Sequence, residues 1–311
     1  MTLPPIKIKY LTKWIKEILK KNIFIHTIFA LPFHFHPLKY LQNYFLSKKY
    51  SYKNLENFSF KKNIVIVGSG PSLDEINLSA VRNSTVIFLN GSVRKYENFD
   101  KTSNNFLWYA QDINGVNRHI STAQFFKIKK VFTIGIWNTP FAFKKHLSAE
   151  DVFFLSRASF RRDRDYQTNK SKSFYSFRPE YFGFDGNGLK IKSLKNRYLH
   201  SLGSVIFSAI SFSLYHCPKN IVLIGFDAPT TQKAYKYAIG TRSPDQIFSL
   251  CQRSSEFNEK IISHYLASYK ILCEKMRVSI FNYSPLTNEN ILPKICSDEQ
   301  LAETLKFRNE K

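Results

Sequence analysis

Short apolar runs separated by polar and glycine-rich stretches predict an α/β sheet from residue 62 onward. The first run, Ile64 to Val67, is wholly apolar and β-branched, which is typical of a strand buried on both faces. Later runs of the same kind lie at 85–89, 105–109, 130–136, 220–224 and 278–283. Helical patterns at 201–214 and 257–276 separate the last of these runs. The pattern predicts a Rossmann-like, mostly parallel sheet flanked by helices.

The first predicted strand runs directly into a glycine-rich turn, Gly68, Ser69 and Gly70, followed by Pro71. Pro71 fits the first turn of a helix, and free N–H groups at such a strand–turn–helix junction bind phosphate. A dinucleotide fingerprint would need a third glycine where this chain has Leu73. A nucleotide monophosphate is therefore favoured over NAD, and a plain tight turn in an α/β domain is the alternative.

Polar residues follow several of the other predicted strands. Ligands of open α/β sheets bind beyond the carboxyl ends of the strands, so these residues are candidate ligand contacts. Each of them also fits an ordinary turn. They are Asn90, Gln111, Asn138 and Asp227, to which the start of the 201–214 helix adds Gly203 and Ser204.

Residues 1–61 form a predicted basic, amphipathic extension. In 10–23 the apolar residues recur at helical spacing and lysines fill much of the remainder. An aromatic segment broken by Pro32 and Pro37 follows. Such a segment can lie in a membrane interface, drawn by anionic lipid, or its apolar face can pack on the domain that follows.

Composition narrows the class of protein. Hydrophobic content of 43% with 16% aromatic residues excludes a disordered chain. The 46 Lys and Arg residues against 23 Asp and Glu give a charge of +23, which predicts an anionic partner. Four widely spaced cysteines suit a reducing, cytosolic compartment and argue against a zinc site. The sequence shows neither a signal peptide nor an apolar run of about 18 residues.

We expect residues 62–311 to be one domain with inserted, lid-like segments near 156–200 and 228–256. The first segment is rich in arginine and aromatic residues and contains Asp163 and Asp165, a D-x-D pair of the kind that binds a divalent metal and a nucleotide-sugar phosphate. Such a pair normally ends an apolar strand, whereas this one lies among arginines. A solvated loop face is the alternative for the whole segment.

The order of these motifs resembles a known family. The turn 68–73, reading G-S-G-P-S-L, is followed by Asn90, then by L-G-S-V at 202–205 and by L-I-G-F-D at 223–227. This order is similar to that of the bacterial lipooligosaccharide sialyltransferases of glycosyltransferase family 42, and of the motility-accessory glycosyltransferases that share the G-x-G-P-S-L opening. The resemblance covers roughly residues 62–295. It implies a GT-A-like variant of the Rossmann-like fold.

The resemblance also implies which residues hold the donor. In that family the glycine turn and the asparagine after the second strand bind the cytidine nucleotide. The asparagine that ends the third strand in that family falls near Gln111 here, which is a departure. The implied nucleotide-binding residues are Gly68, Ser69, Gly70, Ser72, Asn90, Gln111, Gly203, Ser204 and Asp227.

The implied reaction is an inverting transfer of sialic acid from its CMP donor to a sugar of a surface glycolipid. Of the family's two phosphate-contacting tyrosines, the second falls on Tyr235 here. The first falls on Pro229, which is a departure, and Tyr237 is its candidate substitute. Its catalytic histidine lies near the start of the last long helix, where this chain has a single histidine, His264, a few residues later than simple counting would place it. An imidazole suits a base for a hydroxyl acceptor because it titrates near neutral pH, and a half-buried helix histidine bonded to a neighbour is the alternative. His200 and His119 are weaker rivals for this base, and Arg197 and Arg242 are the arginines that could stabilise the leaving phosphate.

We therefore expect a sialyltransferase-like glycosyltransferase that requires no cofactor, with magnesium or manganese compatible but not essential. Its expected partners are a CMP-sialic acid donor, a glycolipid or oligosaccharide acceptor and an anionic membrane surface. We expect no binding of nucleic acid. A homo-oligomer is compatible with the sequence. Its expected location is the cytoplasmic, inner face of a bacterial inner membrane. The alternatives are a metal-dependent hexosyltransferase that uses UDP- or GDP-sugars, and a non-transferase nucleotide-binding α/β protein. Nucleic-acid binding would explain the charge, but no RNA- or DNA-binding motif accompanies it.

Overall fold

The computed structural model describes residues 45, 49–50, 52–111, 113–135, 148, 150–156, 183–185, 188–190, 198–199, 205–227, 266–267, 269–285 and 290–306. Most of the extension and of the two inserted segments lie outside this part of the chain. So do several predicted site residues, namely Tyr235, Tyr237, His264, Gly203, Ser204, Asn138, Asp163 and Asp165.

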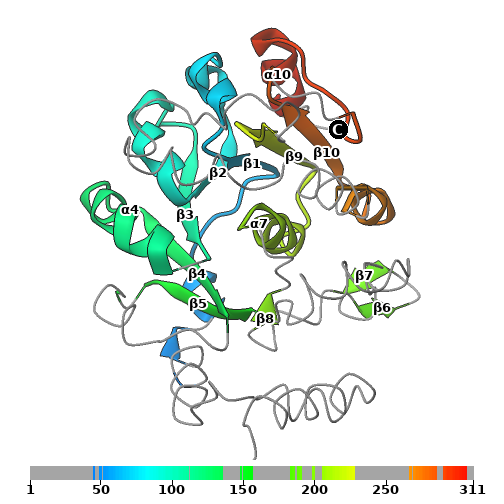
Figure 1. The fold of residues 1–311 in the computed structure, drawn as a ribbon. Coiled ribbons are helices and arrows are strands. Elements are labelled where there is room, and N and C mark those ends of the chain that lie inside the picture. The colour runs from blue at the N-terminus through cyan, green and yellow to red at the C-terminus, as the bar shows by residue number, and fades with distance from the viewer. Residues whose placement is uncertain are drawn as a thin grey trace, which may run out of the picture.

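An eight-stranded sheet forms the centre of the molecule, with the strand order β10-β9-β1-β2-β3-β4-β5-β8 (Figure 1). Every neighbouring pair in it is parallel, so the predicted α/β class with a mostly parallel sheet is confirmed. A separate antiparallel pair, β6 (Gly183–Asp185) and β7 (Gly188–Lys190), lies within the first inserted segment. The strands of the main sheet are β1 (Asn63–Val67), β2 (Ser84–Leu89), β3 (Asn105–Ala110), β4 (Lys129–Gly135), β5 (Val152–Ser156), β8 (Tyr198–Leu199), β9 (Asn220–Ile224) and β10 (Ser279–Tyr283).

Helices cover both faces of this sheet, which is why its central strands are apolar beyond their first one or two residues. Alternate residues of β1 belong to two different cores, Ile64 and Ile66 to one and Val65 and Val67 to the other. The first core includes α7 (Val205–Leu214) and residues 269–273 of a helix ahead of β10. The second includes the 3₁₀ helices η2 (Pro71–Asp74), η3 (Leu78–Ala80) and η4 (Asn90–Asn98), together with α4 (Ile113–Phe125) and α10 (Asp298–Leu305).

The chain leaves β1 and β9 on opposite faces of the sheet. After β1 it passes through η2 and η3, whose Leu73 and Leu78 belong to one core. The helix that precedes β10 buries Tyr269 and Leu272 in the other core. The boundary between β1 and β9 is therefore a topological switch point, the place where open α/β sheets bind their ligands beyond the carboxyl ends of the strands.

Several local features differ from the sequence prediction. The turn after β1 enters short 3₁₀ helices instead of an α-helix, because Leu73 and Ile76 bury themselves in the core within a few residues. The apolar run of β5 was not predicted as a strand. Residues 52–61 of the predicted extension include the helix η1 (Tyr52–Leu55), whose Leu55 is buried in the first core.

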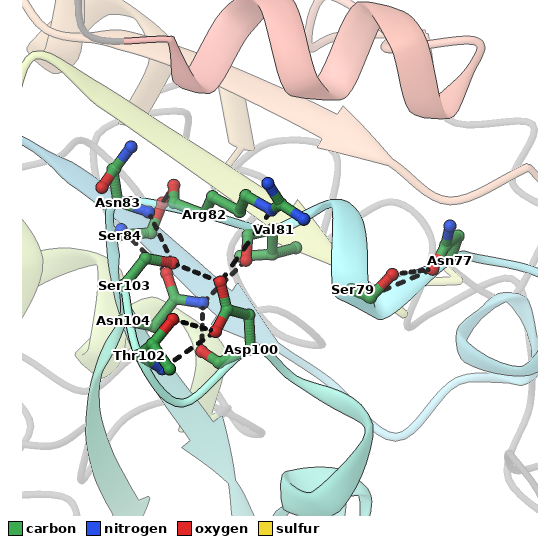
Figure 2. A network of polar contacts seen from close by, with 10 residues as sticks. All are labelled: Asn77, Ser79, Val81, Arg82, Asn83, Ser84, Asp100, Thr102, Ser103 and Asn104. Atoms are coloured by element: carbon green, nitrogen blue, oxygen red, sulfur yellow. Dashed lines mark hydrogen bonds and ion pairs between the residues drawn. The ribbon is translucent and has the colours of Figure 1, made fainter.

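The amino ends of β2 and β3 are joined by the polar network drawn in Figure 2. The Asn104 side chain accepts from the Ser84 N–H at 3.0 Å and donates to the Val81 carbonyl at 2.7 Å. Nearby, Asp100 accepts hydrogen bonds from Thr102 and Ser103, and these bonds lower the pKa of its carboxyl to about 2. The network holds the starts of both strands in register.

His216, just beyond the end of α7, is enclosed by aromatic rings. Its ring stacks on Phe60 with centroids 3.4 Å apart and meets the edge of Phe212 at 5.0 Å. Burial lowers the pKa of the imidazole from 6.5 to about 3, so the folded protein keeps His216 neutral.

This burial predicts acid sensitivity. In the unfolded chain His216 is protonated below about pH 6.5, whereas in the folded protein it is protonated only below about pH 3. The free energy of unfolding therefore falls as the pH falls from about 6.5 to about 3. We expect protonation of His216 in the unfolded chain to make the free energy of unfolding about 2 kcal/mol lower at about pH 5 than at pH 7. Urea titrations at the two pH values measure this loss, and His216→Gln should reduce it by the same amount. An equal loss in the variant and the parent would assign the acid sensitivity to other groups.

Candidate functional site

The glycine turn after β1 is fixed to the loop after β9 by backbone hydrogen bonds. The Gly68 N–H donates to the Ile224 carbonyl at 2.7 Å, and the Gly70 N–H donates to the Gly225 carbonyl at 2.9 Å. Gly225 has φ +64°, a left-handed conformation that favours glycine. Because the β9 loop occupies these two amides, they are not free to bind phosphate as the sequence suggested.

Close approach of the two loops explains why the turn needs glycine. A Cβ at Gly68 would lie 2.4 Å from the Gly225 carbonyl oxygen. A Cβ at Gly70 would lie 2.7 Å from that oxygen and 2.3 Å from Asp227 Oδ2. The bare backbone of the turn thus accommodates the loop after β9, and the close approach expected of a ligand is made there by another part of the chain.

Asp227 and Ser72 complete this junction. The Ser72 N–H donates to Asp227 Oδ2 at 2.8 Å, and its hydroxyl donates to Oδ1. Burial raises the pKa of the Asp227 carboxyl, while the hydrogen bonds from Ser72 oppose that rise. Both residues were predicted to contact the nucleotide, and in this structure they bind each other.

Asn90 lies at the carboxyl end of the neighbouring strand β2. It has φ +49°, and its carbonyl accepts from Trp108 Nε1 at 2.8 Å. Two residues later the Ser92 hydroxyl donates to the Val67 carbonyl at 2.7 Å, which ties this turn to the end of β1. The Asn90 amide oxygen is buried and has no hydrogen-bond partner among the residues that the structure describes. A buried acceptor in this state is costly without a donor, and a bound ligand can supply one.

Gln111 directly follows β3 and connects this edge to α7. Its Oε1 accepts from the Ser208 hydroxyl at 3.2 Å, so the first turns of α7 lie beside the carboxyl end of β3. Gly203 and Ser204 directly precede α7 in the sequence but lie outside the described residues.

The structure brings the described candidates together at one edge of the sheet. The turn 68–72, Asn90, Gln111 and Asp227 follow β1, β2, β3 and β9, which are neighbours in the order β9-β1-β2-β3. Ser69 is partly exposed within the turn. The placement of Tyr235, Tyr237 and His264 relative to this edge stays a prediction.

Three contributors to this edge were not predicted from the sequence. They are Ser92 and Trp108, described above, and Ser284, whose hydroxyl accepts from the Phe226 N–H at 2.9 Å. The serine that follows Asn90 and Gly91 could have been recognised as a turn-forming hydroxyl. The Trp108 and Ser284 contacts depend on which strands are neighbours, for which the local sequence holds no signal.

The described residues contain no group of three His, Cys, Asp or Glu side chains that could hold a metal ion. Nor does this part of the chain contain a helix with the length and apolarity of a membrane span.

Comparisons with known proteins give matches only among solved structures. No protein-family model matches the chain, and no curated protein does. One structural neighbour is the sialyltransferase CstII from Campylobacter jejuni, solved in complex with a substrate analogue, cytidine-5′-monophosphate. The two chains are 15% identical with a TM-score of 0.41, and the match covers 77% of this chain and 87% of the CstII chain. Another is the MAf glycosyltransferase from Magnetospirillum magneticum AMB-1, with 12% identity and a TM-score of 0.44, over 80% of this chain and 37% of that one.

Proposed function

We propose that this protein is a glycosyltransferase that binds a CMP-activated sugar at the edge formed by β9, β1, β2 and β3. The buried amide oxygen of Asn90 carries the proposal, because it lies beside the topological switch point and has no hydrogen-bond donor among the described residues. The order of the G-x-G-P-S-L turn, Asn90 and the G-F-D end of β9 supports a cytidine nucleotide. The donor would be CMP-sialic acid or another CMP-nonulosonic acid, and the acceptor a sugar of a bacterial surface glycolipid.

The locked loops set how the nucleotide would be held. Because the Gly68 and Gly70 amides are bonded to the β9 loop, side chains at the ends of the strands would bind the nucleotide. Asn90 would accept a hydrogen bond from an N–H or O–H group of the nucleotide. The junction of Ser72 with Asp227 would act indirectly, by fixing the loops on which the binding groups stand.

In the proposed reaction an acceptor hydroxyl attacks the anomeric carbon of the sialic acid. The bond from that carbon to the phosphate oxygen breaks with inversion, and CMP leaves with the electron pair. His264 would take the hydroxyl proton, and the Tyr235 and Tyr237 hydroxyls would donate hydrogen bonds to the departing phosphate. These three roles come from the sequence resemblance and need no metal ion.

Removing the Asn90 side chain tests the nucleotide site. Asn90→Gly keeps a backbone that tolerates φ +49° and deletes the buried amide, so we expect CMP affinity to fall by about ten-fold or more. Unfolding free energy should stay within about 0.5 kcal/mol of the parent, because the buried Asn90 Oδ1 has no hydrogen-bond partner among the described residues to lose. Calorimetric titration with CMP and urea unfolding measure the two quantities. Unchanged affinity would remove Asn90 from the site.

The transfer reaction is tested with CMP-sialic acid and a lipooligosaccharide acceptor, following CMP release. His264→Ala should lower acceptor-dependent turnover by about a hundred-fold or more while CMP affinity is kept. His216→Gln is a matched control, because His216 packs among Phe60 and Phe212 and has no proposed role in the reaction. Full turnover in the His264 variant would refute its assignment as the base.

A further inference from the structure

The amino ends of six neighbouring strands carry a row of exposed basic residues. In sheet order from β10 to β4, each strand has at least one Lys or Arg shortly before its first residue. Strands are spaced by about 4.8 Å, so six of them extend this row over about 25 Å. The exposed members are Arg277 before β10, Lys219 before β9, Lys62 before β1, Arg82 before β2, Lys101 before β3 and Lys127 before β4.

Within the part of the chain that the structure describes, no such row follows the carboxyl ends of the strands. The described residues that directly follow β1, β2, β3, β9 and β10 are 68–70, 90–92, 111, 225–227 and 284–285, and none of these is Lys or Arg. Among the described residues that flank these strands, the basic side chains therefore precede the strands and do not directly follow them.

Acidic residues lie beside part of the row. Arg82 lies 3.9 Å from Asp100, and Lys101 pairs with Glu97. The exposed acids near the β9 and β10 end are Glu274 and Glu303. Lys306 adds a further positive charge there, because the Leu305 carbonyl accepts from the side chain of Asn63 at the start of β1. The row as a whole remains positive.

The predicted basic extension joins the domain at this same edge. The Asn54 side chain donates to the Asp151 carbonyl at 2.8 Å, just ahead of β5, and Lys129 Nζ at the start of β4 donates to the Asn54 carbonyl at 2.9 Å. Figure 1 shows the blue N-terminal segment beside β4 and β5. Phe125, at the end of α4 and two residues before Lys127, is 79% exposed. A large exposed aromatic beside lysines is typical of a membrane-interface contact.

We propose that the amino edge of the sheet docks on an anionic lipid bilayer. The row of cations suits an anionic surface, and Phe125 enters the headgroup region. Because all strands of the sheet are parallel, docking by this edge turns the carboxyl edge away from the lipid. The inference holds whatever nucleotide the carboxyl edge binds.

The test is flotation of the full chain with vesicles of phosphatidylcholine, with and without about 30% phosphatidylserine. Each basic residue near an anionic surface contributes about five-fold to binding, so Lys219→Gln/Arg277→Gln should weaken partitioning about 30-fold. Arg94→Gln/Arg118→Gln is the matched control, because it removes two exposed arginines away from this edge and should change binding less than about two-fold. Melting temperatures show whether each variant is folded. If Lys219→Gln/Arg277→Gln does not fold, Lys61→Gln/Lys306→Gln replaces it in the same flotation experiment.

Equal losses in the edge and control variants would overturn the proposal, because binding would then follow overall charge or the extension alone. Equal binding to neutral and anionic vesicles would also overturn it. A single-stranded oligonucleotide that binds more tightly than the anionic vesicles, and loses affinity in the edge variant, would assign the row to nucleic acid instead.

Discussion

Gly68→Ala is expected to lower the free energy of unfolding by about 3 kcal/mol and to abolish CMP binding. The new Cβ would lie 2.4 Å from the Gly225 carbonyl oxygen and 3.0 Å from its carbon. Both are backbone atoms of a strand end that is bonded to the turn, so neither can move without breaking the Gly68–Ile224 or Gly70–Gly225 hydrogen bond. Urea unfolding and calorimetric titration with CMP measure the two losses.

Ser69→Ala is the matched control for this prediction, since it changes the same turn without adding a Cβ. It should alter stability by less than about 0.5 kcal/mol. If Gly68→Ala were as stable as Ser69→Ala, the turn and the β9 loop could separate at little cost. The locked junction would then not describe the protein in solution.

Asp151→Ala is expected to lower the free energy of unfolding by about 3–5 kcal/mol, because it leaves a buried charge unpaired. Lys130 Nζ lies 3.1 Å from Asp151 Oδ1, and the two side chains are only 8% and 1% exposed. The same carboxylate also accepts from the Lys130 N–H and, through Oδ2, from the Ser148 N–H at 2.7 Å. The pair therefore fixes the amino ends of β4 and β5, where the N-terminal segment joins the domain.

Urea unfolding measures this loss, and two variants identify its cause. Lys130→Met/Asp151→Ala should recover part of it, because no buried charge is left without a counterion. Glu97→Ala, which removes an exposed pair with Lys101, should cost less than about 0.5 kcal/mol. A double variant as unstable as Asp151→Ala would show that the lost backbone hydrogen bonds, and not the charge, account for the effect.

Local sequence patterns were sufficient for most of the sheet. The apolar runs that became β1, β2 and β9 are buried on both faces, and burial on both faces is what makes such runs recognisable. Asn90 and Asp227 were recognised for the same reason, because a polar residue at the end of a buried strand interrupts a clear pattern.

The use of the glycine turn could not be read from the sequence. Its amides bond to Ile224 and Gly225, more than 150 residues away, and this contact exists only because β9 lies beside β1. A short sequence pattern records that bare backbone is needed but not what approaches it. The pairing of Ser72 with Asp227 escaped prediction for the same reason, since each residue alone resembles a ligand contact.

The most direct test of the central claim is competitive titration of the full chain with CMP, UDP and GDP. The claim is that the edge where the β1 and β9 loops lock together, flanked by Asn90, binds a cytidine nucleotide. We predict that CMP binds at least about ten-fold more tightly than UDP or GDP, and that Asn90→Gly removes this preference. Tighter binding of UDP or GDP would contradict the claim and favour a hexosyltransferase that uses Asp163 and Asp165.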